Sequence, residues 1–358
     1  MPNQFIPSKP DFNRLLKTVT LDGAPDRVPF FEIFGQIEDP VLDALKQRDP
    51  SFERLCPAES GDTTGAAAFK RHVSYMYATG YDYCTVIPDF EFTKSLSRSD
   101  ITDRDFLTSH DAMIRTRDDF DNYPWPDAAR MDLSPFAYAE QFMPVSMKVS
   151  VYSRGPHLAA LYLLGYEGLS YMLADDEKLL SDVINTAGER VLECYKKCAA
   201  IDIVGALGIG EDLAFYGATY LPPDILRKHV FPWYKKIVRA CHEYGKPAIF
   251  HSCGNNEAVM EDIIACGFDA KHSFEDKITP VWEEKRKWGG RIAVLGGFDM
   301  HKISSLSPAE VKKHVAFLMD NCKAGGGWAL GTGNSVAVYV PVENFLAMID
   351  EGFLLGKY

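Results

Sequence analysis

Short apolar runs alternate with amphipathic segments along most of the chain. Several of these runs are apolar throughout, which is typical of strands buried on both faces. Alternation of strands with helices favours parallel strands joined by right-handed crossovers. In a chain of 358 residues, the pattern predicts a single α/β domain, a (β/α)₈ TIM barrel over residues 1–358. The expected strands are Val28–Phe34, Asp82–Pro88, Met147–Ser153, Asp202–Leu207, Pro247–Ser252, Asp269–Phe274, Ile292–Gly296 and Gly327–Leu330.

Three of the intervening helices carry clear boundary signals. Pro223–Tyr244 begins with a proline and is followed by Gly245, the usual asymmetry of helix ends. Ser307-Pro308-Ala309-Glu310 has the pattern of a capping box. The last expected helix, Pro341–Leu355, closes the barrel.

One stretch, from about Phe92 to Asp127, does not follow this alternation of strands and helices. It is polar, it contains the short alternating piece Ala112–Thr116, and it ends in Tyr123-Pro124-Trp125-Pro126. The alternation predicts a β-hairpin excursion on the loop after the second strand. Such an excursion acts as a lid or rim of the barrel, or is a surface loop without function; the sequence leaves both open.

Charge and cysteine content exclude several classes of function. The formal net charge of −12 argues against nucleic acid, whose phosphates demand a basic surface. The eight cysteines form no CxxC pair, so we expect reduced thiols and a cytoplasmic protein. The N-terminus lacks a signal pattern, and no uncharged apolar run approaches the ~18 residues of a membrane span. The oligomeric state stays open, with a homodimer as one alternative.

Polar and ionisable residues gather where the expected strands end. In TIM barrels the working residues lie at the carboxyl ends of the strands, so we expect these side chains to face one mouth. These residues also have structural interpretations. Glu211-Asp212 can cap the following turn and Asp299 can cap a helix, and asparagine is common in glycine-rich turns such as the one that contains Asn334. The candidate catalytic residues are Glu211, Asp89, Glu275 and Asp299, and the candidate substrate-binding residues are Glu32, Arg154, His272 and Asn334.

The sharpest chemical signal is His251-x-Cys253 at the end of the fifth expected strand. Residues two apart share a face of a strand, so both side chains can enter one pocket. Imidazole with thiolate favours zinc, and Glu211 is the expected oxygen ligand or proton-transfer group. His272 or Glu275 is expected to supply a further ligand or to orient His251. The competing interpretation is a buried cysteine beside a hydrogen-bonded histidine.

These motifs resemble a known family. Phe250-His251-Ser252-Cys253-Gly254 is similar to the HxCG strand of the uroporphyrinogen decarboxylase superfamily, especially its corrinoid- and coenzyme-M-linked methyltransferases. The resemblance covers nearly the whole chain and implies a TIM barrel. Its further matches are Gly245-Lys246-Pro247, Gly80-Tyr81-Asp82, Pro124-Trp125-Pro126, Asp202-Ile203, Glu211-Asp212 and Pro341-Val342-Glu343-Asn344.

Two departures from the family patterns bear on function. The decarboxylases carry an arginine-rich segment after the first strand, whereas residues 31–39 here contain three acids and no arginine. Acids there would repel a polycarboxylate substrate. The thiol-directed methyltransferases have a second zinc cysteine in the loop after the eighth strand, and Asn334 stands at that position. With one thiolate fewer, a bound metal is more electrophilic, which suits an oxygen or nitrogen methyl donor.

The resemblance therefore implies an O-demethylase methyltransferase. It would hold one Zn²⁺ per chain at His251, Cys253 and Glu211, acting as a Lewis acid. It would move a methyl group from a small O-methyl or N-methyl donor, such as an aryl methyl ether, to the corrinoid (cobalamin) of a partner protein. The first alternative is a cofactor-free decarboxylase of a smaller acid, with Arg154 as carboxylate anchor. The second is a non-catalytic barrel that binds a small molecule or a corrinoid protein.

Overall fold

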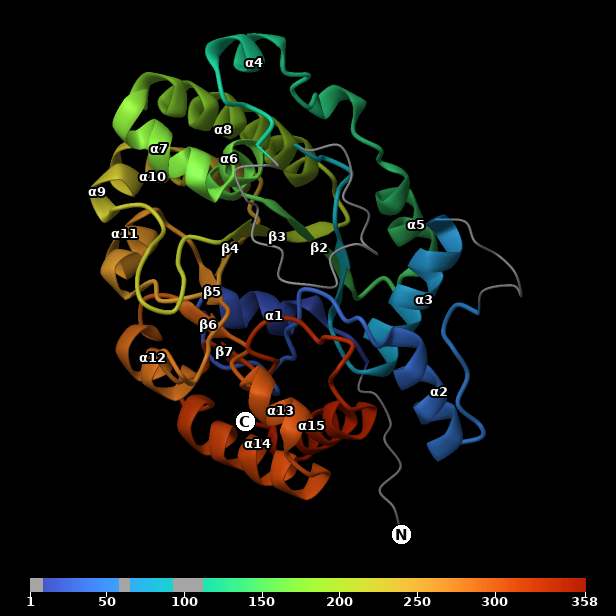
Figure 1. Cartoon of the computed structure of the whole chain (residues 1–358). Helices are drawn as coiled ribbons and strands as arrows, with labels where there is room; N and C mark the ends of the chain where they lie inside the picture. The colour runs from blue at the N-terminus through green and yellow to red at the C-terminus, as the bar shows by residue number, and fades with distance from the viewer. Residues whose placement is uncertain (1–8, 58–64, 93–111) are drawn as a thin grey trace.

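A computed structural model describes residues 9–57, 65–92 and 112–358 of the chain. These residues form one parallel sheet of seven strands, whose order in the sheet follows the sequence (Figure 1). The sheet curls, and helices cover its outer face, as in a TIM barrel. The strands are β1 Tyr83–Val86, β2 Lys148–Arg154, β3 Val204–Glu211, β4 Ala248–Ser252, β5 Ala270–His272, β6 Ala293–Leu295 and β7 Trp328–Ala329.

Seven of the eight expected strands are confirmed, and the first, Val28–Phe34, is extended chain. It forms one parallel bridge, between Phe30 and Leu330 next to β7. Pro29 has no amide hydrogen, which limits how far pairing can continue. On the other side the Tyr83 hydroxyl of β1 accepts from the Glu32 amide at 2.8 Å. The fold is thus TIM-barrel-like, and complete closure by an eighth strand stays a prediction.

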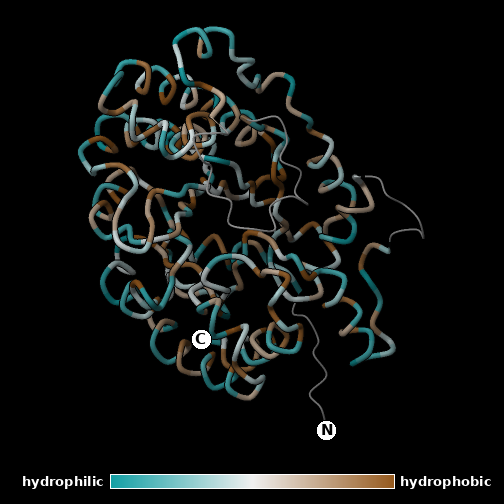
Figure 2. Tube along the Cα trace, viewed as in Figure 1, coloured by the Kyte–Doolittle hydropathy of each residue, from teal (hydrophilic) through white to brown (hydrophobic). Residues whose placement is uncertain are grey.

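Amphipathic helices alternate with the strands, and hydrophobic and hydrophilic residues alternate along them (Figure 2). Among the described helices, none has both the length and the apolar character of a bilayer span. The α-helices are α1 Phe12–Val19, α2 Glu38–Arg48, α3 Gly65–Ala78, α4 Arg117–Asn122, α5 Ser134–Phe142, α6 Pro156–Leu164, α7 Tyr166–Asp175, α8 Glu177–Ala199, α9 Pro223–Ile225, α10 Phe231–Glu243, α11 Met260–Ala265, α12 Val281–Trp288, α13 Met300–Ser305, α14 Pro308–Cys322 and α15 Val342–Leu355. The shorter turns are the 3₁₀ helices η2 Ala128–Arg130 and η4 Glu257–Val259, and the π-helical η3 Leu226–Val230.

The helices with boundary signals form where the sequence predicts them. The Ser307 hydroxyl accepts from the Glu310 amide and the Glu310 carboxylate accepts from the Ser307 amide, so α14 begins with a full capping box. The helix expected over 223–244 is divided into α9, η3 and α10. Pro232 explains the division, because it lacks the amide hydrogen that a continuous α-helix needs there.

The hairpin expected within residues 92–127 is not confirmed. Residues 93–111 lie outside the described part of the chain, and residues 112–127 contain α4 without a strand. Thr116 caps α4, and its side chain forms a capping box with Asp119. This local hydrogen bonding favours a helix over the strand that the alternation in Ala112–Thr116 suggests.

Candidate functional site

His251 and Cys253 lie side by side at the carboxyl end of β4. The His251 Nε2 and Cys253 Sγ atoms are 3.7 Å apart. His251 is buried and faces Tyr152 of β2 edge-on, whereas Cys253 is partly accessible. The spacing of two residues therefore brings both side chains to the same place, as the sequence predicts.

A second histidine orients the His251 ring. His251 and His272 are register partners on β4 and β5, and their Nδ1 atoms are 2.9 Å apart. Burial lowers the pKa of His251 to about 3 and lowers the pKa of His272 as well, so both rings are neutral at neutral pH. With His251 Nδ1–H as the donor, its Nε2 lone pair is directed towards Cys253, which is the state that a metal ligand requires.

The Cys253 sulfur is surrounded by polar partners. It accepts hydrogen bonds from Asn334 Nδ2 at 3.1 Å and from Ser273 Oγ at 3.4 Å. The Asp212 carboxylate lies close enough to Cys253 to interact electrostatically with its thiol and amide. Burial raises the pKa of Cys253 to about 12, so the metal-free protein holds a thiol rather than a thiolate. Asp212 is placed to take up that proton.

Glu211 lies on the opposite face of β3. Its carboxylate accepts from the backbone amides of His157 at 3.0 Å and Leu158 at 2.6 Å, at the amino end of α6. A helix amino terminus is a favourable place for a carboxylate. Burial raises the pKa of Glu211 to about 8. Because neighbouring strand residues point to opposite faces, Asp212 rather than Glu211 accompanies Cys253.

This placement changes what we expect of Glu211→Gln. A glutamine turns an NH₂ group towards one of the two amide donors of α6. We therefore expect the free energy of unfolding to fall by about 1–3 kcal/mol, while zinc retention stays as in the wild type. Denaturant unfolding and metal analysis measure the two quantities. If Glu211→Gln loses zinc while its stability is unchanged, Glu211 is a zinc ligand after all.

A small cavity, with room for about one water molecule, lies inside the sheet beside His251 and His272. Aromatic and aliphatic side chains, among them Phe31 and Tyr152, form much of its wall. Glu32 also lines it, and its carboxylate accepts from the Thr332 hydroxyl at 2.7 Å. Burial raises the pKa of Glu32 to about 8, which favours the neutral acid. Of the described residues, no lysine or arginine lines this cavity.

Comparison with known proteins supports the fold and identifies the family. The sequence model of the uroporphyrinogen decarboxylase (URO-D) family matches residues 110–352. The chain belongs to this family. A structure titled as a methyltransferase from Methanosarcina mazei has the same fold: its TM-score is 0.67 at 16% identity, over 95% of this chain and 97% of that chain.

Two curated relatives of the URO-D-family chain are methyltransferases by name. Both are "Methylcobamide:CoM methyltransferase MtaA", one from Methanosarcina barkeri and one from its strain Fusaro. Each is 23% identical over 163 residues, which is 45% of this chain and 47% of the relative. The chain thus spans about half the length of the curated relatives it matches.

The donor pair of this family member fits zinc. Tetrahedral ligands with Zn–S near 2.3 Å and Zn–N near 2.0 Å lie roughly 3.6 Å apart, close to the 3.7 Å between Sγ and Nε2. Across the described ranges, no group of three or more His, Cys, Asp or Glu side chains is arranged to hold a metal ion. A third protein ligand therefore requires a side-chain movement, and Asp212 is near enough to the thiol to influence its pKa.

The remaining candidates are placed elsewhere. Asp299 caps α13, accepting from the amides of His301 and Lys302 at 2.9 and 3.1 Å. This structural role accounts for the residue without a catalytic one. Arg154 forms an ion pair with Glu91 and stacks over Tyr162. None of these contacts is with His251 or Cys253. Two others, Asp89 and Glu275, are exposed.

Two contributors to the site carry no distinctive sequence signal. Asp212 is one residue from the predicted Glu211, and a strand end cannot be located to a single residue from the sequence. Ser273 is an ordinary serine after a buried strand, and its contact with Cys253 depends on an unusual backbone conformation, φ +82°. That conformation is typical of glycine, so the residue type gives no hint of it.

Proposed function

We propose that the protein is a methyltransferase that moves a methyl group from a small O-methyl compound to the corrinoid of a partner protein. An aryl methyl ether is the first donor class and an N-methyl compound the second. The observation that carries the proposal is the pair His251 and Cys253 at zinc spacing, with the amide of Asn334 on the sulfur. The names of the curated relatives support methyl transfer involving a methylcobamide.

In this proposal one zinc ion per chain is held by His251 Nε2 and Cys253 Sγ. Asp212 takes the place that the sequence gives to Glu211: it would accept the thiol proton, release it to solvent and then offer its carboxylate as an oxygen ligand. His272 holds the His251 ring through its Nδ1 contact. The bound zinc would supply a Lewis acid at the donor heteroatom, which stabilises the leaving oxygen.

The wall of the small cavity beside His251 has the chemistry that a neutral aromatic ether requires. Phe31 and Tyr152 offer ring faces and edges for contact with an aromatic group, and the side chains around the cavity would have to move apart to admit the donor. Glu32 is neutral below about pH 8, so it can hydrogen-bond an ether substituent without introducing a charge. A neutral, ring-lined cavity favours this donor class over a polycarboxylate.

Exposed apolar side chains follow two of the strands at the carboxyl edge of the sheet. Tyr216, after β3, is 67% exposed, and Val338 and Tyr339, after β7, are 71% and 63% exposed. Side chains of this kind are enriched in protein interfaces. They support docking of the corrinoid protein over the same end of the sheet that holds Cys253.

The decarboxylase alternative predicts a cation for the substrate carboxylate, and the structure supports no such assignment. Arg154, the expected anchor, is paired with Glu91, and the cavity wall contains Glu32. We therefore expect no coproporphyrinogen from uroporphyrinogen. Product analysis by fluorescence after oxidation checks this. Turnover at roughly 1 s⁻¹ or faster would refute our interpretation of the cavity.

The deciding experiment for the function is a metal assay joined to a donor screen. Purified protein is analysed for zinc and then incubated with O-methyl and N-methyl aromatic compounds, with and without a reduced corrinoid protein. We expect demethylation only with zinc and corrinoid together. Decarboxylation without metal would favour the cofactor-free decarboxylase. Binding without turnover would favour the non-catalytic binding barrel.

A further inference from the structure

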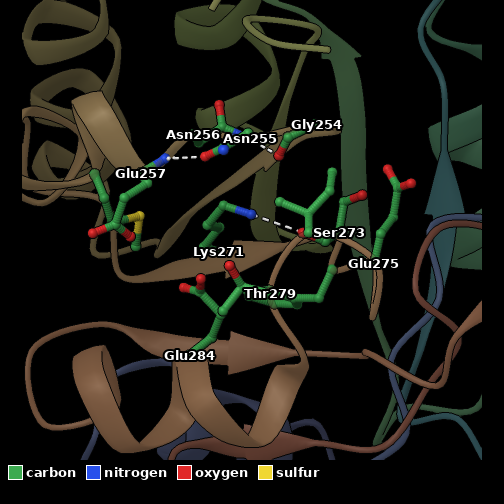
Figure 3. A pocket seen from close by; sticks show the side chains of 12 residues that line it. Gly254, Asn255, Asn256, Glu257, Lys271, Ser273, Glu275, Thr279 and Glu284 are labelled. Atoms are coloured by element: carbon green, nitrogen blue, oxygen red, sulfur yellow. Dashed lines mark hydrogen bonds between the residues drawn. The ribbon is translucent and has the colours of Figure 1, made fainter. Parts of the chain in front are cut away.

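Lys271 is a buried lysine beside the site that the proposed reaction does not use. It lies in β5 between Ala270 and His272 and is 4% exposed. Because neighbouring strand residues point to opposite faces, its side chain leaves the sheet on the side away from the His251 cavity. It lines a small pocket (Figure 3). The ammonium nitrogen stands 4.2 Å from the centre of the Phe274 ring. Burial lowers the pKa of Lys271 to about 8.

Such burial requires compensation, because an amine without partners in a protein interior is strongly destabilising. Lys271 Nζ donates to the backbone carbonyl of Ser273 at 2.7 Å (Figure 3). Among the described residues no carboxylate forms an ion pair with it, and Glu284 acts only at longer range. The principal partner of the amine is therefore a single backbone carbonyl.

That carbonyl belongs to a strained residue in contact with the site. Ser273 has φ +82°, which non-glycine residues rarely adopt. In this conformation its hydroxyl donates to Cys253 Sγ at 3.4 Å. The following amide, of Phe274, donates to the carbonyl of Gly333 at 3.1 Å, next to Asn334. One turn thus connects the Lys271 pocket with both groups that donate to the Cys253 sulfur.

We propose that Lys271 is a positioning residue for Cys253. Its amine holds the carbonyl of Ser273, which keeps the left-handed turn in place. This turn directs the Ser273 hydroxyl at the Cys253 sulfur. The proposal rests on the proposed function only in giving Cys253 a working role; the geometry itself does not depend on zinc. The hydroxyl, 3.4 Å from the sulfur, thereby holds Cys253 in the position from which it meets a metal or an electrophile.

A double-mutant cycle on the full chain tests this. Lys271→Met, Ser273→Ala and the double variant are compared with the wild type. The rate of Cys253 alkylation by iodoacetamide is measured in metal-free protein at one fixed pH, by mass spectrometry of the Cys253 peptide. We expect each single change to slow alkylation about tenfold, the equivalent of one hydrogen bond to a charged group. The double variant should be little slower than Ser273→Ala, because Lys271 acts mainly through Ser273 and only weakly through its charge on the sulfur.

Controls separate positioning from general loss of structure. Lys277→Met removes an exposed lysine from the same loop and should leave the rate unchanged. Lys271→Gln keeps a buried donor and should recover part of the rate; it also replaces Lys271→Met in the cycle if that variant does not fold. A wild-type rate in Lys271→Met, or additive slowing of about a hundredfold in the double variant, would overturn the proposal.

The same variants distinguish this proposal from the function. Zinc content is measured separately on each protein after growth with zinc. A chain that shows the non-additive cycle but binds no zinc would refute the proposed function and leave the positioning role of Lys271. A chain that binds zinc and demethylates but shows no coupling between Lys271 and Ser273 would support the proposed function and refute the positioning role of Lys271.

Discussion

His251→Ala and Cys253→Ser are each expected to abolish retention of stoichiometric zinc and, with it, demethylation. Each change removes one of the two donors that lie 3.7 Å apart at the end of β4. Loss of a group that merely orients a ligand already weakens metal binding about 10- to 100-fold, so loss of a ligand itself should weaken it by more than about 100-fold. Elemental analysis after dialysis, and titration with a coloured zinc chelator, measure the effect.

The chain offers a matched control for this prediction. Cys266 is a buried cysteine on another element, and its sulfur is directed to the Phe231 carbonyl at 3.7 Å. Cys266→Ser should keep zinc, while Asp212→Asn should weaken its binding, since the Asp212 carboxylate lies near the Cys253 thiol and is the proposed oxygen ligand. A wild-type protein without metal, even after growth and purification with zinc, would exclude the proposed mechanism. The decarboxylase and binding alternatives would then become the leading ones.

The sequence predicts those parts of the fold that depend on local pattern. Most of the strands from β1 to β7 are short runs in which apolar residues predominate and which are buried on both faces, a composition typical of parallel sheets. The capping box at Ser307 is local too, since all its atoms lie within one turn. The segment at Val28–Phe34 is equally apolar, yet it forms one bridge only. Hydrogen bonding with neighbours distant in sequence decides that difference.

The site was predictable where the spacing within one strand fixes the geometry. The pair His251 and Cys253 follows from a period of two, which holds wherever the strand begins. The choice between Glu211 and Asp212 depends on the phase of β3 at its last residue, and a shift of one residue reverses the face. The hydroxyl of Ser273 reaches Cys253 only through a left-handed turn supported by a buried amine. No residue-type pattern contains that information.

Asn334→Cys is expected to tighten zinc binding and to slow demethylation. Asn334 Nδ2 lies 3.1 Å from Cys253 Sγ, so a cysteine at this position places a second sulfur beside the first. Two thiolates donate more charge to zinc than one thiolate with nitrogen and oxygen ligands, and the ion becomes a weaker electrophile. We expect zinc affinity to rise about tenfold or more and the demethylation rate to fall about tenfold or more, the equivalent of ~1.4 kcal/mol in each.

The opposite result, faster demethylation by Asn334→Cys, would mean that the metal activates the methyl acceptor and not the methyl donor. The curated relatives are named for transfer from methylcobamide to CoM, and a zinc ion that activates a thiol acceptor benefits from thiolate ligands. Asn334→Ser serves as the control, because it removes the amide without adding a thiolate and should not tighten zinc binding. If Asn334→Cys speeds demethylation, or the wild type methylates a free thiol efficiently from methylcobalamin, the metal activates the acceptor. The amide at Asn334 would then be a feature of the Cys253 environment and not the cause of a donor-side reaction.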